Sequence, residues 1–64
     1  MKLSAFIDQH LDHGNYVHIK TITNYSLYNG LVANIPYRLA VKSTFVDCAI
    51  SNDEIVVHAI YHNN

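Results

Sequence analysis

Apolar residues at the start of the chain recur at the spacing of one helix face. The stripe consists of Leu3, Phe6, Ile7 and Leu11. Ser4 is a candidate N-cap, because its hydroxyl can accept a hydrogen bond from a free amide of the first turn. Gly14 is expected to adopt the left-handed conformation that ends many helices. The pattern therefore predicts an amphipathic helix between Ser4 and Gly14.

The next segment, NYVHIKTIT, alternates between apolar and polar residues. Val17 and Ile19 would point to one side of an extended chain, and His18 and Lys20 to the other. This alternation is typical of a half-buried strand. Asn24 then marks a turn, because Asn favours turn conformations.

The rest of the chain predicts a second strand over residues 26–35, a short helix or turn over 35–42, a third strand over 44–50 and a fourth over 54–62. Gly30 indicates a bulge or a close backbone approach in the second strand. Pro36 suits the first turn of a helix, where its missing N–H has no partner. The fourth strand, EIVVHAIYH, is more apolar than the first, so we expect it to be central in the sheet.

The order helix, hairpin, short helix, hairpin predicts an α+β fold in a single domain, residues 1–64. A four-stranded antiparallel sheet, covered on one face by the N-terminal helix, satisfies this order. The opposite sheet face would carry Tyr, His and aliphatic side chains. That face is the natural candidate for a partner surface.

Charge and hydropathy exclude two classes of function. Only 14% of the 64 residues are charged, and the formal net charge is −1. The few basic residues are scattered, whereas nucleic-acid-binding proteins usually carry a basic stripe, so we expect no direct contact with nucleic acid. No apolar run approaches the roughly 20 residues that span a bilayer, and no signal-peptide cleavage site is present. We therefore expect a cytoplasmic protein that does not associate with membranes.

A chain this short buries only about 60% of its unfolded surface, and such domains often add a disulfide, a metal or a partner subunit. Cys48 is the only cysteine, which excludes an intrachain disulfide and favours a reducing compartment. Its alternation with Val46 and Ile50 predicts a small core side chain and not a nucleophile. With few charges and an apolar fourth strand, we expect a homodimer formed through a strand edge or a sheet face.

The histidines are the other candidates for chemistry. In HLDHG, His10 and His13 stand three residues apart, a spacing that could place two metal ligands on one helix face. The simpler interpretation puts both in the last turn of the helix, where a positive charge meets the negative end of the helix dipole.

In HAIYH, His58 and His62 stand four residues apart, but Ala59 occupies the place of the glutamate in the protease motif HExxH. On a strand these two histidines share one face, and His18 would lie on the same face. We expect a polar outer face there, with no metal and no cofactor. A His-based metal or enzymatic site remains an alternative hypothesis.

Tyrosine and asparagine are abundant for a chain of this size. Tyrosine offers a large contact area at low entropic cost, as recognition surfaces require. Tyr25 and Tyr28 near the first hairpin turn, and Tyr37 beside Pro36, lie where regular structure is expected to end. We expect these tyrosines, with Arg38, to contact a partner. No phosphate-binding loop, nucleophile elbow or spaced carboxylate pair is present, so no enzyme is expected.

The segments MKLSAFIDQHL, YNGLVANIPYRL and FVDCAISNDEIVVHAI resemble small orphan proteins encoded by phages and mobile elements of Gram-positive bacteria. Those chains also open with MKLxxF and carry a Gly-x-x-x-x-Ile-Pro segment before a final hairpin, here Gly30 to Pro36. They usually have many acidic residues where this chain has Asn, Tyr and His. The resemblance implies a phage origin, and it implies binding and disabling of a host protein, CRISPR and other defence nucleases included.

The hypothesis from sequence is therefore a non-enzymatic protein-binding module that inhibits a host or defence protein by covering part of its surface. One alternative is a homo-oligomeric structural or regulatory accessory protein. The other is the His-based metal or enzymatic site.

Overall fold

The computed structural model describes residues 1–63 of the chain. Its elements are α1 (Leu3–His10), β1 (Tyr16–Lys20), β2 (Ser26–Leu31), the 3-10 turn η1 (Val32–Asn34), α2 (Tyr37–Lys42), β3 (Ser43–Ser51) and β4 (Glu54–Tyr61). The expected order of helix, hairpin, short helix and hairpin is confirmed, and the fold is α+β. The second strand is shorter than predicted, because the chain leaves the sheet after Leu31 and enters η1.

The sheet is mixed, so the expectation of a purely antiparallel sheet is wrong. The strand order is β2-β1-β4-β3, with β4 in a central position as predicted. The two hairpins are antiparallel, but β1 pairs with β4 in parallel. The physical reason is the connection through α2, which returns the chain to the other end of the sheet before β3 begins. Strands β2 and β3 therefore run in the same direction, and so do their hairpin partners β1 and β4.

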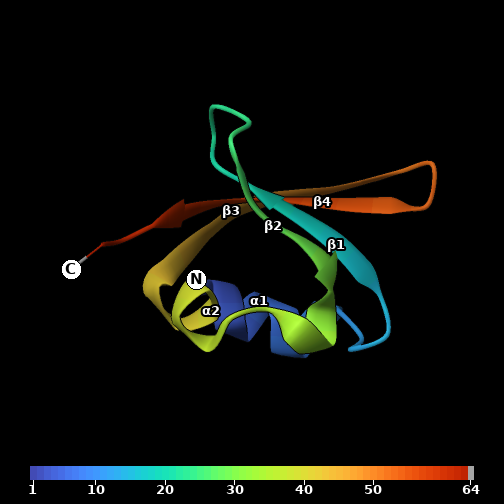
Figure 1. The fold of residues 1–64 in the computed structure, drawn as a ribbon, viewed down its shortest axis with the longest axis horizontal. Coiled ribbons are helices and arrows are strands. Elements are labelled where there is room, and N and C mark those ends of the chain that lie inside the picture. Colours follow the sequence, from blue (N-terminus) through green and yellow to red (C-terminus); the bar gives the residue numbers. More distant parts are fainter. Residues whose placement is uncertain (64) are drawn as a thin grey trace.

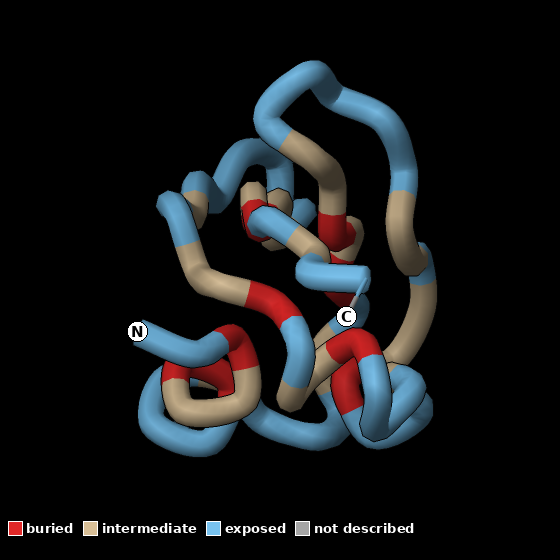
Figure 2. The backbone as a smooth tube through the Cα atoms, turned by 90° about the vertical axis from the view of Figure 1, so that its left-hand side faces the viewer, coloured by how far each residue is buried: buried red, intermediate tan, exposed pale blue. Residues whose placement is uncertain are grey.

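Both helices cover the same face of the sheet (Figure 1). The core lies between the helices and the sheet. It is formed by Leu3, Phe6, Ile7, Val17, Ile19, Val32, Leu39, Val57 and Ala59. Figure 2 shows these buried positions gathered where the helices face the strands. The alternation predicted for β1 is confirmed, because Val17 and Ile19 are buried while His18 and Lys20 are only half-buried.

The ends of α1 differ from the prediction. Lys2, not Ser4, is the N-cap residue, and no side chain caps this end of the helix. The start is displaced because Lys2 bridges to Thr44 of β3, which holds the N-terminal residues against the sheet. At the other end the helix stops at His10, and Gly14 has no positive φ. Leu11 is extended at this point and its side chain packs against the core, so the chain leaves the helix to bury it.

A β-bulge changes the predicted pattern of β3. The register with β4 shifts between Phe45 and Asp47, so Val46 has no direct partner. Cys48 and Ile50 then lie opposite Val57 and Ile55. Val46, Cys48 and Ile50 were expected to share one face, but the extra residue separates Val46 from the other two.

Gly30 provides the close approach that the sequence predicted. The hydroxyl oxygen of Tyr28 lies 2.9 Å from the position that a Cβ on residue 30 would occupy. That hydroxyl donates a hydrogen bond to the carbonyl oxygen of Leu31 at 2.7 Å, which fixes the ring over the glycine. The bulge in this hairpin lies at Leu27, where the register shifts between Ile19 and Lys20, and not at Gly30.

We expect Gly30→Ala to lower the free energy of unfolding by about 1 to 3 kcal/mol, the usual cost of overpacking. The new methyl group would displace the Tyr28 ring and break its bond to Leu31. Gly14→Ala is the matched control, because nothing lies within 4 Å of a Cβ at that position. Urea denaturation of both variants is the measurement, and equal stability of the two would contradict the packing of Tyr28 on Gly30.

Candidate functional site: the uncovered sheet face and the β1–β2 turn

We call the sheet face opposite the helices the uncovered face. The strand register places on it Tyr16, His18, Lys20, Asn29, Thr44, Asp47, Ala49, Val56, His58 and Ile60. This is the Tyr-, His- and aliphatic-bearing face that the sequence predicts. Figure 1 shows that, within residues 1–63, no helix lies on this side, and that the turn between β1 and β2 projects from it.

Each histidine of β1 and β4, and His62 just after β4, has a hydrogen-bonding neighbour. The Nε2 atom of His18 lies 2.9 Å from the hydroxyl of Ser26, and Nε2 of His62 lies 2.8 Å from the hydroxyl of Thr44. These pairs join neighbouring strands. The expected polar outer face with three histidines is therefore present, and its histidines are oriented by hydrogen bonds.

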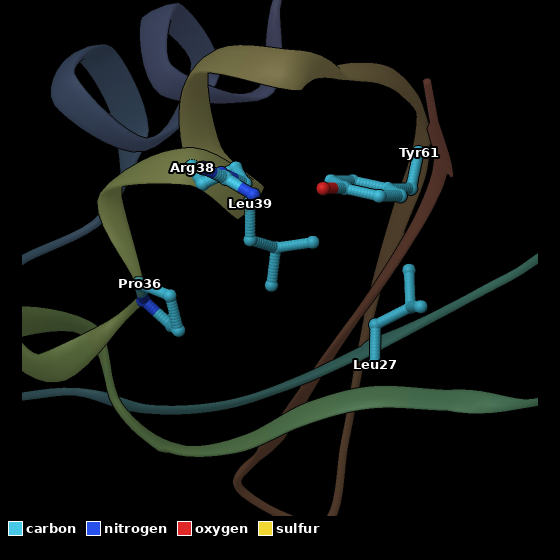
Figure 3. Close-up of a pocket in the computed structure, with 5 residues that line it drawn as sticks. All are labelled: Leu27, Pro36, Arg38, Leu39 and Tyr61. Atoms are coloured by element: carbon cyan, nitrogen blue, oxygen red, sulfur yellow. The ribbon is translucent and has the colours of Figure 1, made fainter. Parts of the chain in front are cut away.

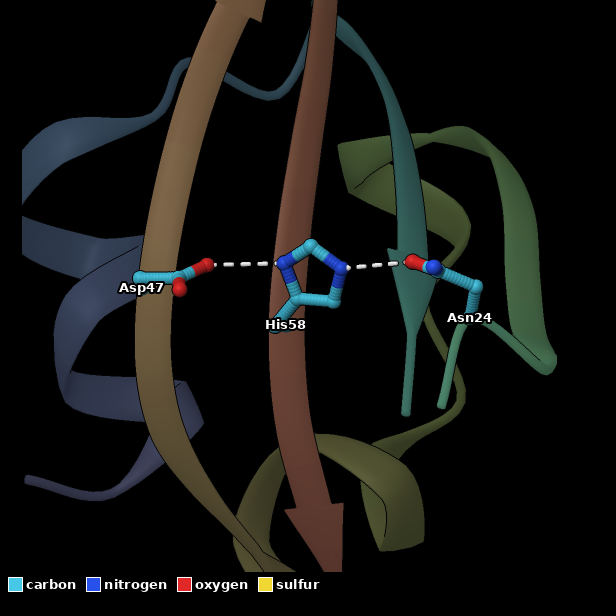
Figure 4. A network of polar contacts seen from close by, with 3 residues as sticks. All are labelled: Asn24, Asp47 and His58. Atoms are coloured by element: carbon cyan, nitrogen blue, oxygen red, sulfur yellow. Dashed lines mark hydrogen bonds and ion pairs between the residues drawn. The ribbon is translucent and has the colours of Figure 1, made fainter. Parts of the chain in front are cut away.

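His58 occupies the centre of the polar network (Figure 4). Its Nδ1 atom lies 2.7 Å from the carboxylate of Asp47, and its Nε2 atom lies 3.0 Å from the side-chain oxygen of Asn24. Both ring nitrogens of His58 therefore have a side-chain oxygen within hydrogen-bond distance. The bulge at Val46 aligns Asp47 with His58 in the ladder.

This network resembles part of a catalytic triad but lacks its nucleophile. In a Ser-His-Asp triad, the ring nitrogen opposite the carboxylate faces the attacking group. Here Asn24 takes that position, and an amide is not a nucleophile of this kind. Cys48 follows Asp47 but faces the helix side, opposite Val57. The arrangement suits a structural role in which His58 holds Asn24.

Asn24 brings the β1–β2 turn, residues 21–25, onto the uncovered face. Its backbone is left-handed, with φ of 67°. Within the turn, the Thr21 amide donates to the Tyr25 carbonyl at 2.8 Å, and the Tyr25 amide donates to the Thr21 hydroxyl at 3.0 Å. The turn is thus closed on itself and attached to His58.

Two large side chains project from this turn. Ile22 is 62% exposed and Tyr25 is 72% exposed. Tyr25 was expected to project here, and it does. The sequence did not indicate Ile22, because this residue lies in the segment NYVHIKTIT, whose alternation predicts a half-buried strand.

The other predicted contact residues lie elsewhere. Tyr37 is 81% exposed at the start of α2, next to the exposed Arg38. Tyr28 is half-buried and bonded to Leu31, so its side chain does not project as expected. The turn with Tyr25 and the helix with Tyr37 lie on opposite sides of the sheet (Figure 1). One flat partner surface could not contact both tyrosines.

A pocket of about 280 Å³ lies beside α2. Its lining residues are Leu27 from β2, Pro36, Arg38 and Leu39 from the start of α2, and Tyr61 from β4. Figure 3 shows the Tyr61 ring extending from β4 toward Leu39. The walls are mainly apolar, with the Arg38 guanidinium and the Tyr61 hydroxyl as polar groups. Such a pocket suits an apolar side chain that lies next to a carboxylate.

The remaining candidates for chemistry are separate from one another. His10 lies in the last turn of α1, as expected, with its ring centroid 5.0 Å from that of Phe6. His13 lies beyond the helix, so its placement in the last turn is wrong. Among residues 1–63, no three His, Cys, Asp or Glu side chains gather as a metal site would require. No helix in the same range is long and apolar enough to cross a bilayer.

Cys48 packs against the core, as the sequence predicts. Burial raises the pKa of its thiol, and the negative charge of Asp47 raises it further. Both effects disfavour the thiolate, which is the reactive form of cysteine. This environment is the opposite of the one that activates a catalytic thiol.

Comparison of the chain with protein-family models, with curated proteins and with solved structures finds no match. What the protein does must therefore be inferred from the chemistry of its own surfaces.

At pH 8 we expect the folded protein to react with a disulfide reagent more slowly than the unfolded chain does. The raised pKa of Cys48 leaves less thiolate at that pH. Asp47→Asn should move the pH of half-maximal reactivity downward, because it removes a negative charge that opposes ionisation of the thiol. Asp53→Asn is the control and should leave the profile unchanged. An unchanged profile for Asp47→Asn would show that the carboxylate does not act on the thiol.

Asn24→Gly should loosen the turn while keeping its left-handed backbone. Hydrogen exchange of the Thr21 and Tyr25 amides, followed by NMR, should accelerate about fivefold, since one side-chain hydrogen bond contributes about 1 kcal/mol. Asn52→Gly is the matched control, because Asn52 has φ of 51° in the other hairpin turn. Equal exchange in the two variants would mean that His58 does not hold the turn.

Proposed function

We propose that the protein is a non-enzymatic protein-binding module that docks through its β1–β2 turn. One observation carries the proposal: two large side chains, Ile22 and Tyr25, project into solvent from a turn that hydrogen bonds hold in place. Because these two side chains are exposed, they do not contribute to packing in the core. They suit insertion into a partner.

The order of the turn is what makes it suitable for binding. Association must overcome the entropy lost when loops and side chains become fixed, and a preorganised loop reduces that cost. Here the turn is closed by Thr21 and Tyr25 and attached to the sheet by the contact between Asn24 and His58. Tyrosine is enriched among the few residues that carry most of the binding energy at protein interfaces.

The charges near the turn indicate the kind of surface that the partner presents. Residues 21–25 carry no charged side chain. The complementary site is therefore an apolar depression with a rim of hydrogen-bonding groups, and binding depends little on salt.

The resemblance to small phage proteins supports a host or defence protein as the partner. In that role the module acts as an inhibitor that occupies a functional surface of its target and supplies no chemistry of its own. The partner is expected to be found in the cytoplasm of the host cell, where a free thiol such as Cys48 remains reduced.

The test begins with affinity capture from a lysate of the host, using the parent protein and the double variant Ile22→Ser/Tyr25→Ala. A true partner should be retained by the parent and lost from the variant. In titrations with that partner, Tyr25→Ala should weaken binding at least thirtyfold, or about 2 kcal/mol, at both low and high salt.

Two controls locate the binding site. Tyr37→Ala and Arg38→Ala change the surface on the other side of the sheet and should leave the affinity within threefold of the parent. If these variants lose binding while the turn variant keeps it, the pocket beside α2 is the contact site and the proposal is wrong. Melting curves of all variants should be similar, because each changed side chain is exposed.

A further inference from the structure

The free edge of β3 is a second feature that the binding turn does not explain. As an outer strand of the sheet, β3 has β4 on one side only. Its last five residues, 47–51, include no Lys, Arg or Pro, which are the residues that usually protect such an edge. All of them except Cys48 are exposed, and Ile50 is 73% exposed.

The beginning of the same edge already accepts extended main chain. The amide of Phe45 donates to the carbonyl of Met1 at 2.8 Å, and Lys2 forms an antiparallel bridge with Thr44. The N-terminal residues therefore cover the edge around Phe45. Beyond them, residues 47–51 offer the same kind of backbone without a partner strand among the described residues.

The ladder determines which backbone groups face outward. Residues of an antiparallel strand alternate between facing the neighbouring strand and facing away from it. The bond to Met1 shows that Phe45 faces away from β4, and the bulge at Val46 then shifts the alternation by one residue. The backbone N–H and C=O groups of Cys48 and Ile50 therefore point away from β4, whereas those of Ala49 bond to β4.

We propose that the protein forms a two-fold symmetric dimer in which β3 pairs with β3 of a second copy, joining two sheets of four strands into one of eight. The middle of the free segment is Ala49, so the two-fold axis passes between the two Ala49 residues. Cys48 of each copy then exchanges main-chain hydrogen bonds with Ile50 of the other.

The free segment is complementary to itself in this register. Asp47 lies opposite Ser51 of the other copy, so the two carboxylates, the only charges in the segment, are kept apart. The two Ala49 residues form a pair without mutual hydrogen bonds, where strands approach most closely and a small side chain fits. The other edge, β2, is a weaker candidate, because its last carbonyl already accepts a bond from Tyr28.

Cysteine cross-linking tests this register directly. In a Cys48→Ser background, Ala49→Cys should form an interchain disulfide under mild oxidation, because the Cα atoms of such a pair lie about 4.5 Å apart, within disulfide range. Ile50→Cys in the same background is the matched control. Its two copies would lie about 8 Å apart, from about 3.4 Å per residue along the strand, and should cross-link at least tenfold more slowly.

Sedimentation of uncross-linked protein provides the second measurement. Ile50→Pro removes an outward amide that β4 does not use, and it should weaken the dimer at least tenfold, whereas Ile50→Ser keeps that amide and should weaken it less. A parent protein that stays monomeric at millimolar concentration, or equal cross-linking at positions 49 and 50, would overturn the proposal. The interface does not include Ile22 or Tyr25, so such a failure would leave the binding turn untouched.

Discussion

The parallel pairing of β1 with β4 is the contact on which the rest of the structure depends. It joins two hairpins, and a single hairpin is marginally stable in water at best. Ile19 and Val57 lie side by side in this pair and are both completely buried. Each hairpin therefore contributes one strand to the centre of the sheet and leaves the other at an edge. Neither hairpin could bury its apolar residues without the other and the helices that cover both.

The same pairing builds the uncovered face. It sets Lys20, the last residue of β1, opposite His58, so the turn that follows Lys20 lies within reach of the imidazole. The bulge in β3 aligns Asp47 from the other side. His58 thereby connects two segments that are 23 residues apart in the chain, Asn24 and Asp47. A bulge and a left-handed Asn are costly locally, and both serve this one network.

The elements could be predicted from the sequence because local patterns encode them. The alternation around Val17 and Ile19 predicts a strand, whichever neighbouring strand it pairs with. The direction of β4 relative to β1 could not be predicted, because it depends on the path of the chain through α2. The start of α1 depends in the same way on a distant contact, that of Lys2 with Thr44. At the candidate site, the sequence could predict that Tyr25 lies in a turn. It could not predict the contact of Asn24 with His58, because that contact forms only when β4 pairs with β1.

The distribution of polar groups explains why the margins of the sheet, and not its centre, are suited to binding. The histidines on the uncovered face already have hydrogen-bonding neighbours, and a partner that covered them would gain little while removing them from water. The exposed side chains of Ile22, Tyr25 and Ile50 lie in the first turn and toward the tip of the second hairpin. The polar centre thus acts as a rigid support, and it holds an apolar turn at one margin while the strand edge remains open at the other.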